Sequence, residues 1–180
     1  MNSSMNNPTQ VKENPPQAKE KPLVLFIDDE TKVLQVAKKM LEHANYDLMT
    51  FNNAEEALAI VEKRAVAVVV SDNRMPKMKG LDFFEKIKVI SPMTVRILTT
   101  AYYDESLVGE IVNKGEVFRF LKKPLDFGLA KSTIMLGLEH YKKDIVAAEK
   151  ATLFEKMIRT LAQFRQKCET LTTEVGHLKK

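Results

Sequence analysis

Five side chains that could bind a metal ion or a phosphoryl group stand at the ends of apolar runs in this sequence. Asp28 and Asp29 follow the first run, Asp72 ends the third, Thr100 ends the fourth, and Lys123 comes just after the fifth. Short apolar runs bounded by turn residues are typical of the buried strands of a parallel sheet. Ligands bind at the carboxyl ends of such strands, so we expect these side chains to meet at one edge of a sheet.

Carboxylates brought to one edge repel one another unless a cation neutralises them. Hard oxygen ligands suit Mg²⁺, which keeps some of its waters and is completed by a phosphate oxygen. Asp28 and Asp29 could bind the metal while Asp72 attacks phosphorus. Thr100 and Lys123 could hold the phosphoryl oxygens, which completes a set for phosphoryl transfer. The plain alternative is that these acids are solvated turn residues.

The apolar pattern also predicts the elements that position these residues. Strands are expected over 23–27, 46–51, 66–71, 94–100 and 117–121, and a helix with one apolar face begins after each of them. Asn53 and Glu56 match a capping box at the start of the second helix. The fourth helix is expected around 107–112, and a long helix begins near Asp126. This alternation over 23–127 predicts right-handed crossovers and a doubly wound, five-stranded parallel α/β sheet.

Composition and charge narrow the classes of protein to which this chain can belong. Its 180 residues are 44% hydrophobic, and no apolar run reaches the roughly 20 residues that a membrane helix needs. The net charge of +4 lies mainly in 128–180, where acids alternate with bases, so it favours a solvated helix face over a nucleic-acid surface. Residues 1–22 are predicted to be disordered and lack the pattern of a secretory signal. The single cysteine, Cys168, suits a reducing cytoplasm.

Four motifs, in this order, resemble the receiver domain of two-component response regulators. They are Phe26-Ile27-Asp28-Asp29-Glu30, Ser71-Asp72-Asn73-Arg74-Met75-Pro76-Lys77-Met78-Lys79-Gly80, Leu98-Thr99-Thr100-Ala101 and Phe120-Leu121-Lys122-Lys123-Pro124. Each motif alone is modest, but all four at receiver spacing are highly specific. The resemblance covers 23–127 and implies a flavodoxin-like receiver fold.

The resemblance implies a role for each acid. Asp72 would accept a phosphoryl group from a phosphohistidine on a sensor histidine kinase or a phosphotransfer protein. Asp29 and Asp72 would bind Mg²⁺ directly. The backbone carbonyl of Arg74 would be a third ligand, and Asp28 would act through water.

The resemblance also implies a switch beside the acids. Thr100 and Lys123 would bind the phosphoryl oxygens, and the peptide between Lys123 and Pro124 is expected to be cis. Thr100 is preferred to Thr99 because the small residue after it leaves room for the phosphoryl group. Movement of Thr100 toward the phosphate, with Phe120 turning inward behind it, would be the switch. An aromatic residue on a strand is equally well an ordinary core residue.

Two bulky residues are expected to lengthen the life of the phosphorylated state. Arg74 lies two residues after Asp72, and Tyr102 lies two residues after Thr100. In receivers these positions flank the path of the attacking water. Neither side chain is an acid or an amide that would orient that water, so autodephosphorylation is expected to be slow.

The tail carries a heptad pattern typical of a left-handed coiled coil. Its predicted core positions alternate by three and four residues and are Phe154, Met157, Leu161, Phe164, Cys168, Leu171, Val175 and Leu178. Upstream, Leu138, Tyr141, Ile145 and Ala148 keep the same spacing in a different phase. The two phases meet near Ala151, where we expect a discontinuity in the coil.

A parallel homodimer is the preferred reading of these heptads. The alternative is one amphipathic helix, over 128–180, that folds back on the receiver. Few charged pairs flank the seam, so a different helical partner stays open. Phe154 and Phe164 suit a tight two-stranded coil poorly, which also leaves higher order open. Cys168 is interpreted as a packing residue.

These patterns predict a phosphorylated signalling domain whose coiled-coil extension relays the state of Asp72 to a protein partner or to an output domain missing from this chain. An aspartate-nucleophile, Mg²⁺-dependent phosphatase of the haloacid-dehalogenase type is an alternative. Such enzymes need Asp-x-Asp after the first strand, and this chain has Asp28-Asp29-Glu30. A DNA-bound regulator is a third alternative, but no helix-turn-helix, zinc-finger or basic-zipper pattern is present.

Overall fold

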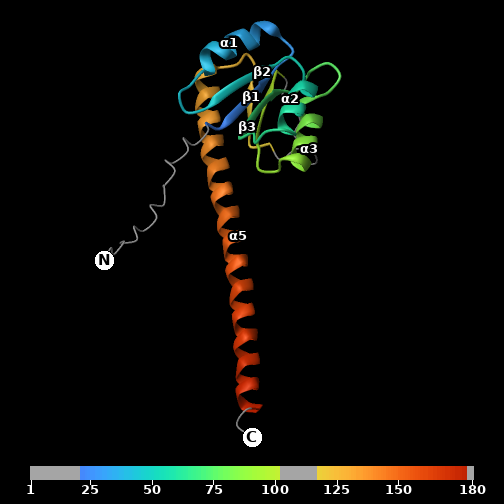
Figure 1. Ribbon diagram of the computed structural model, residues 1–180. Helices are drawn as coiled ribbons and strands as arrows, with labels where there is room; N and C mark the ends of the chain where they lie inside the picture. The colour runs from blue at the N-terminus through green and yellow to red at the C-terminus, as the bar shows by residue number, and fades with distance from the viewer. Residues whose placement is uncertain (1–20, 102–116, 178–180) are drawn as a thin grey trace, which may run out of the picture.

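Five parallel strands form one sheet in the spatial order β2-β1-β3-β4-β5 (Figure 1). This structure is a computed structural model, and it describes residues 21–101 and 117–177. The strands are β1 (Leu23–Ile27), β2 (Asp47–Phe51), β3 (Val68–Asp72), β4 (Val95–Thr100) and β5 (Arg119–Lys122). The strand order reverses beside β1, which makes the carboxyl edge of β1 and β3 the place where ligands bind in such sheets.

Helices cover both faces of the sheet. Helices α2 (Ala54–Val61) and α3 (Gly80–Ile90) pack on one face, and α1 (Thr31–Leu41) and α5 (Phe127–His177) pack on the other. Side chains of β1 alternate between the two cores: Leu25 and Ile27 enter the first, and Phe26 enters the second. Because both faces are covered, the strands read as continuous apolar runs, as predicted.

Local signals in the sequence fix where two helices begin. The side chain of Asn53 accepts a hydrogen bond from the backbone N–H of Glu56 at 2.9 Å, which caps α2 as predicted. The side chain of Asp126 accepts hydrogen bonds from the backbone N–H groups of Gly128 and Leu129 at 2.8 and 3.1 Å. These bonds start α5 one residue after the predicted position.

Helix α5 begins inside the core and ends far from it. Its first turns bury Ala130, Ile134 and Leu138 against the sheet. Gly137 permits this close approach, because a Cβ there would lie 3.2 Å from Val95 and 3.3 Å from Val68. The helix then continues without a break to His177 and projects away from the sheet (Figure 1).

The predicted fold is confirmed, and one alternative for the tail is wrong. The five strands lie within one or two residues of their predicted bounds. Beyond the turns that pack on the sheet, the tail does not fold back over the described part of the chain, because α5 is unbroken as far as His177 and its residues 151–170 are exposed. The predicted fourth helix, Tyr102, Leu178 and nearly all of the segment predicted to be disordered lie outside the described residues. None of the helices in the described ranges is long and apolar enough to cross a membrane.

Candidate functional site

The acids at the ends of β1 and β3 come together, as predicted. Ligand oxygens of Asp28, Asp29 and Asp72 lie within 4.8 Å of one another. Asp28 is fully buried, Asp72 is 6% exposed and Asp29 is exposed. β1 and β3 are hydrogen-bonded neighbours, so their carboxyl ends bring the three carboxylates to one point. Three hard oxygen donors, one of them open to solvent, fit a Mg²⁺ ion that keeps part of its water.

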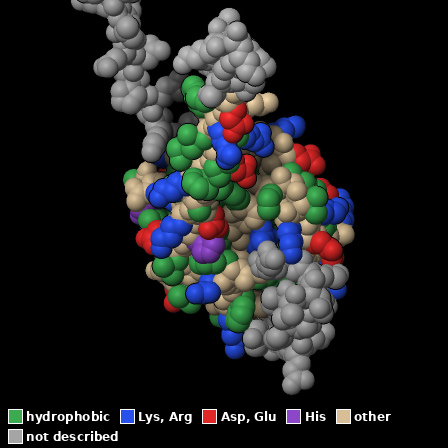
Figure 2. Space-filling view, turned by 90° about the horizontal axis from the view of Figure 1, so that it is seen from below, with side chains coloured by type: hydrophobic (Ala, Val, Ile, Leu, Met, Phe, Trp, Pro, Cys, Tyr) green, Lys and Arg blue, Asp and Glu red, His purple; other side chains and the backbone are tan. Residues whose placement is uncertain are grey.

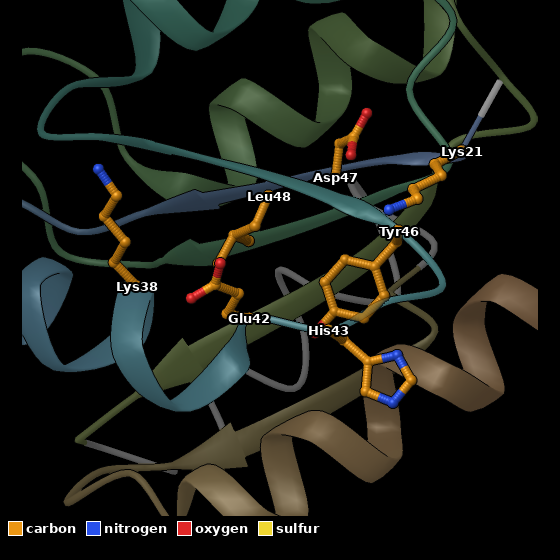
Figure 3. A pocket seen from close by; sticks show the side chains of 7 residues that line it. All are labelled: Lys21, Lys38, Glu42, His43, Tyr46, Asp47 and Leu48. Atoms are coloured by element: carbon orange, nitrogen blue, oxygen red, sulfur yellow. The ribbon is translucent and has the colours of Figure 1, made fainter.

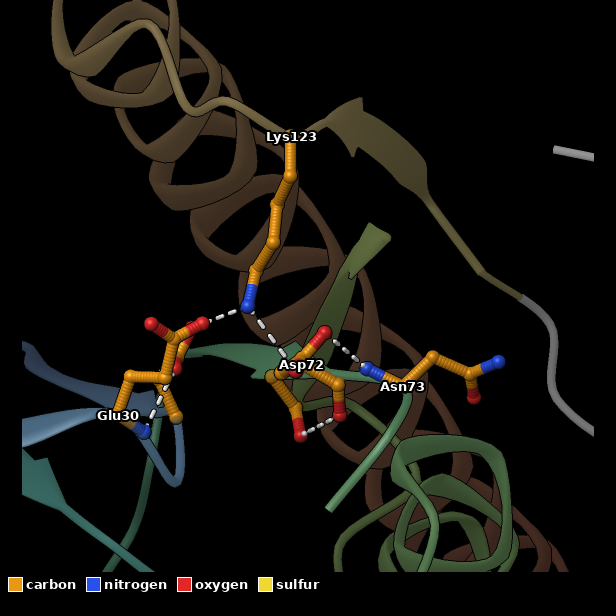
Figure 4. A network of polar contacts seen from close by, with 6 residues as sticks. Glu30, Asp72, Asn73 and Lys123 are labelled. Atoms are coloured by element: carbon orange, nitrogen blue, oxygen red, sulfur yellow. Dashed lines mark hydrogen bonds and ion pairs between the residues drawn. The ribbon is translucent and has the colours of Figure 1, made fainter. Parts of the chain in front are cut away.

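Lys123 brings a positive charge between two of these acids (Figure 4). Its Nζ lies 2.8 Å from Oδ2 of Asp28 and 3.0 Å from Oδ2 of Asp72. The backbone N–H of Lys123 donates to the carbonyl of Thr100 at 2.8 Å, which ties the lysine to the end of β4. The peptide between Lys123 and Pro124 is cis, as predicted. The lysine therefore reaches from β5 across the edge of the sheet to β1 and β3.

Burial and charge act against each other on the pKa values of this pair. Burial raises the pKa of Asp72 above its ordinary value, and the hydrogen bond and charge of Lys123 offset this only in part. Burial alone would lower the pKa of Lys123, but hydrogen bonds and charges from Asp28 and Asp72 outweigh it and raise that pKa. Lys123 therefore stays an ammonium, and ionisation of Asp72 at this position carries an energetic cost.

The loop after β3 holds Asp72 through its backbone. The N–H of Asn73 donates to Oδ1 of Asp72 at 2.8 Å and to the carbonyl of Thr99 at 3.0 Å. The N–H of Gly80 closes the loop by donating to the carbonyl of Asn73 at 3.1 Å. Gly80 cannot carry a side chain here, because a Cβ would lie 2.3 Å from the carbonyl oxygen of Asp72. The first residue of α3 thus packs directly on the backbone of Asp72.

Replacing Gly80 by alanine should therefore destabilise the fold around Asp72. The new methyl group must push the backbone of β3 and the start of α3 apart, which we expect to lower the free energy of unfolding by about 2–3 kcal/mol. Urea denaturation measures the change. Gly128→Ala is the matched control, since its Cβ would meet only the side chain of Asp126, at 3.2 Å. Equal stability of the two variants would contradict the close approach at Gly80.

The other predicted site residues take up different environments. Thr100 and Thr99 are 3% and 1% exposed at the end of β4, and Thr99 pairs in register with Asp72. Phe120 lies on β5 and is 48% exposed, so its side chain points outward. Arg74 is exposed in the loop after β3. Asn73 is buried and was given no role by the sequence, although its position directly after the acid was a signal for it.

A polar pocket lies at the other edge of the sheet, away from the acids (Figure 3). It is lined by Lys21, Lys38, Glu42, His43, Tyr46, Asp47 and Leu48. The Tyr46 ring stacks on His43 with 5.6 Å between ring centroids, and its hydroxyl donates to the carbonyl of Leu41. Burial raises the pKa of Tyr46. These contacts hold the turn between α1 and β2, and none of them reaches the acid cluster.

The sheet order and the acid-lysine cluster at its carboxyl edge define the class: a doubly wound α/β protein of the flavodoxin-like receiver fold. A family model described as "Response regulator receiver domain" matches residues 24–134. The chain belongs to this family.

Relatives and solved structures agree with this assignment. The transcriptional regulator NtrC of Salmonella typhimurium is 31% identical over 121 residues, which are 67% of this chain and 26% of that protein. The hydrogenase transcriptional regulatory protein HoxA of Cupriavidus necator is 26% identical over 161 residues, 76% of this chain and 33% of that protein. The chain thus spans about a quarter to a third of the length of these relatives.

Among solved structures, the signal receiver domain of an HD domain-containing protein from Pseudomonas fluorescens is similar, with a TM-score of 0.65 and 31% identity over 69% of this chain and 99% of that one. A structure described as adenylate cyclase from Rhodopirellula baltica has a TM-score of 0.64 and 33% identity over 74% of this chain and 97% of that one.

Proposed function

We propose that Asp72 accepts a phosphoryl group from a phosphohistidine on a sensor histidine kinase or a phosphotransfer protein. The observation that carries this proposal is the position of its carboxylate, which is 6% exposed and lies beside Asp28, Asp29 and the ammonium of Lys123. A carboxylate that is poorly solvated but positively flanked is a ready nucleophile for phosphorus. Membership in the receiver family supports the same role.

In the proposed transfer an Asp72 oxygen forms a bond to phosphorus as the phosphorus-nitrogen bond to the donor histidine breaks. The carboxylates of Asp28, Asp29 and Asp72 would hold Mg²⁺, together with the backbone carbonyl of Arg74. When bound, Mg²⁺ supplies positive charge that offsets the phosphoryl oxygens. Lys123 is placed to neutralise further charge, because it already bridges two acids at the edge of the sheet.

A groove beside Lys123 is where we place the phosphodonor. Its walls are α1, with Val33 and Val36, and the segment from Leu125 to Phe127, where α5 begins. Lys123 itself lines the groove. A donor protein that covered these apolar side chains would bring its phosphohistidine to the acid cluster and exclude water from it.

The tail is proposed to form a parallel homodimer that relays the state of Asp72 to a downstream protein. Phe154, Leu161 and Phe164 are 59%, 62% and 63% exposed at predicted core positions of the heptads. Large apolar side chains in a sustained heptad need a facing helix to be buried. Thr100 and Phe120 are the proposed switch, and Phe120 is 48% exposed in this structure. We place the protein in the cytoplasm, where its single thiol stays reduced.

Labelling with acetyl phosphate tests the proposed acceptor. We expect one phosphoryl group per chain in the presence of Mg²⁺ and almost none with EDTA, because the acids need a cation to approach a phosphate. Mass spectrometry of the intact chain gives the stoichiometry. Repeated turnover of p-nitrophenyl phosphate would instead favour the phosphatase alternative. A receiver that loses its phosphoryl group slowly does not return to free Asp72 fast enough for repeated turnover. Full labelling without any divalent cation would contradict the proposed metal site.

A further inference from the structure

Two apolar stripes on α5 face in opposite directions. The upstream stripe, with Leu138 and Tyr141, packs against the receiver core. The downstream stripe begins at Phe154, below the receiver, and its side chains are exposed. With 3.6 residues per turn, the two stripes lie on roughly opposite sides of the helix. The predicted phase change near Ala151 is therefore no break in the helix: one side of α5 serves the receiver, and the other is left for a partner.

The side of α5 that is left for a partner continues toward the amino end of the helix, beside the receiver. Steps of seven residues back from Phe164 define one row along the helix, which we name the partner row: Leu129, Leu136, Lys143, Lys150, Met157 and Phe164. Leu129 and Leu136 are 56% and 53% exposed although they lie beside the receiver core. Two exposed lysines interrupt an otherwise apolar row.

In a parallel dimer each residue of the partner row faces its own copy. Lys143 would meet Lys143 and Lys150 would meet Lys150, so four ammonium groups would crowd one stretch of the seam. Beside Lys150 the flanking heptad positions carry no acid that could relieve this repulsion, because Val146 would face Ala151 of the second copy, whereas beside Lys143 Glu139 would face Asp144. Asp144 is also engaged on its own helix, where Nδ1 of His140 lies 2.9 Å from its Oδ2.

Immediately below this stretch the apolar face widens. Leu153 and Ile158 flank the seam residues Phe154, Met157 and Leu161, and all five are more than half exposed. Figure 2 shows hydrophobic side chains among charged ones on the projecting part of α5. A second copy that packed here would bury more apolar surface than at any heptad nearer the receiver among the described residues.

We propose that a second copy of this chain packs along α5 from Leu153 toward the carboxyl end, and that Lys143 and Lys150 hold the two helices apart on the amino side of this contact. This inference rests on the proposed dimer. The junction between receiver and coil is then an open fork, with Leu129 and Leu136 of the two copies facing each other across it. Closing the fork would bring the two receivers together.

Cysteine cross-linking in the full-length chain tests this arrangement. Cys168 reports on the coil, and Ala147→Cys in a Cys168→Ala background reports on the fork, since both positions lie on the seam. Under a copper-phenanthroline oxidant we expect the cross-link at position 147 to form about tenfold more slowly than at 168. Lys143→Leu with Lys150→Leu should bring the rate at 147 up to that at 168. High salt should also narrow the difference, because about 1 M salt shortens the Debye length to about 3 Å.

Lys142→Leu with Lys156→Leu is the matched control, because these two exposed lysines lie on α5 but off the partner row. This pair should leave the rate at 147 unchanged. A dimeric mass with equally fast cross-linking at 147 and 168 in the unmodified row would overturn the fork alone. A monomeric mass by light scattering, with no cross-link at either position, would refute the dimer and the fork with it.

Discussion

Replacing Asp72 by asparagine should abolish labelling by acetyl phosphate and also raise the melting temperature in metal-free buffer. The amide cannot act as the nucleophile. It also removes a buried carboxylate whose pKa is raised by burial, so its ionisation lowers the stability of the folded chain. We expect a gain of about 1 kcal/mol, or about 4 °C, by thermal denaturation in EDTA.

The gain should depend on pH in a direction that follows from the raised pKa of Asp72. Its ionisation begins to destabilise the fold as the pH rises past the ordinary value of 3.8, and the full penalty is present above the folded-state pKa. Asparagine does not titrate in this range. The difference in melting temperature should therefore be small near pH 4 and grow toward neutral pH. Mg²⁺ should narrow it again, because the metal stabilises only the chain that binds it well.

Asp47→Asn is the control for this pair of effects. Asp47 is an exposed acid at the amino end of β2, at the far edge of the sheet from the acid cluster. Its variant should keep both labelling and melting temperature. Labelling that survived in Asp72→Asn would move the acceptor to another residue, and a lower melting temperature in EDTA would show that Lys123 outweighs the burial of Asp72.

Replacing Phe164 by aspartate should convert the dimer to a monomer. Phe164 is 63% exposed on the partner row, and a dimer would place two added carboxylates opposite each other in a buried seam. Light scattering should fall from twice the chain mass of 20.5 kDa to that mass itself. The receiver should remain folded, because α5 has left the core well before this position.

A second apolar-to-acid change distinguishes disruption of the dimer seam from a general effect of added charge. Val89 is 83% exposed near the end of α3, on the receiver. Val89→Asp adds the same charge and should leave the dimeric mass unchanged. A dimer that persists in Phe164→Asp would show that the heptads are not its interface. The same measurement with a beryllofluoride mimic on Asp72 would show whether phosphorylation tightens or loosens the pair.

The sequence predicts the edge of the sheet well because a parallel strand leaves little freedom there. An apolar run that ends in Asp28 or Asp72 must deliver that acid to the carboxyl edge once the strands are parallel. Lys123 follows the same reasoning at the end of β5, whereas its cis peptide was expected only from the resemblance to receivers. The cap of α2 also depends on near neighbours, because Asn53 and Glu56 are three residues apart. Each of these predictions depends on residues that are close in the sequence to the element they control.

What the sequence could not supply depends on contacts between distant segments. The bridging of Asp28 and Asp72 by Lys123 needs three strands in register. The requirement for a residue without a side chain at position 80 appears only when α3 is packed on the backbone of β3. The phase change near Ala151 looked like an irregularity of the coil, because periodicity alone cannot say which side of a helix a receiver already covers. Phe120 could likewise be core or surface until its neighbours were placed.

Because α5 is one unbroken helix, a small tilt of its first turns in the receiver is amplified at its far end. At Gly137 the backbone of α5 packs closely on the side chains of Val68 and Val95, in the strands that carry Asp72 and Thr100. Forty residues of α5 lie beyond Gly137, or about 60 Å at 1.5 Å per residue. A tilt of about 5° at the sheet would move the far end of α5 by about 5 Å, roughly the rise of one helical turn. A movement too small to change the fold of the receiver could thus be large enough for a partner to detect at the far end of α5.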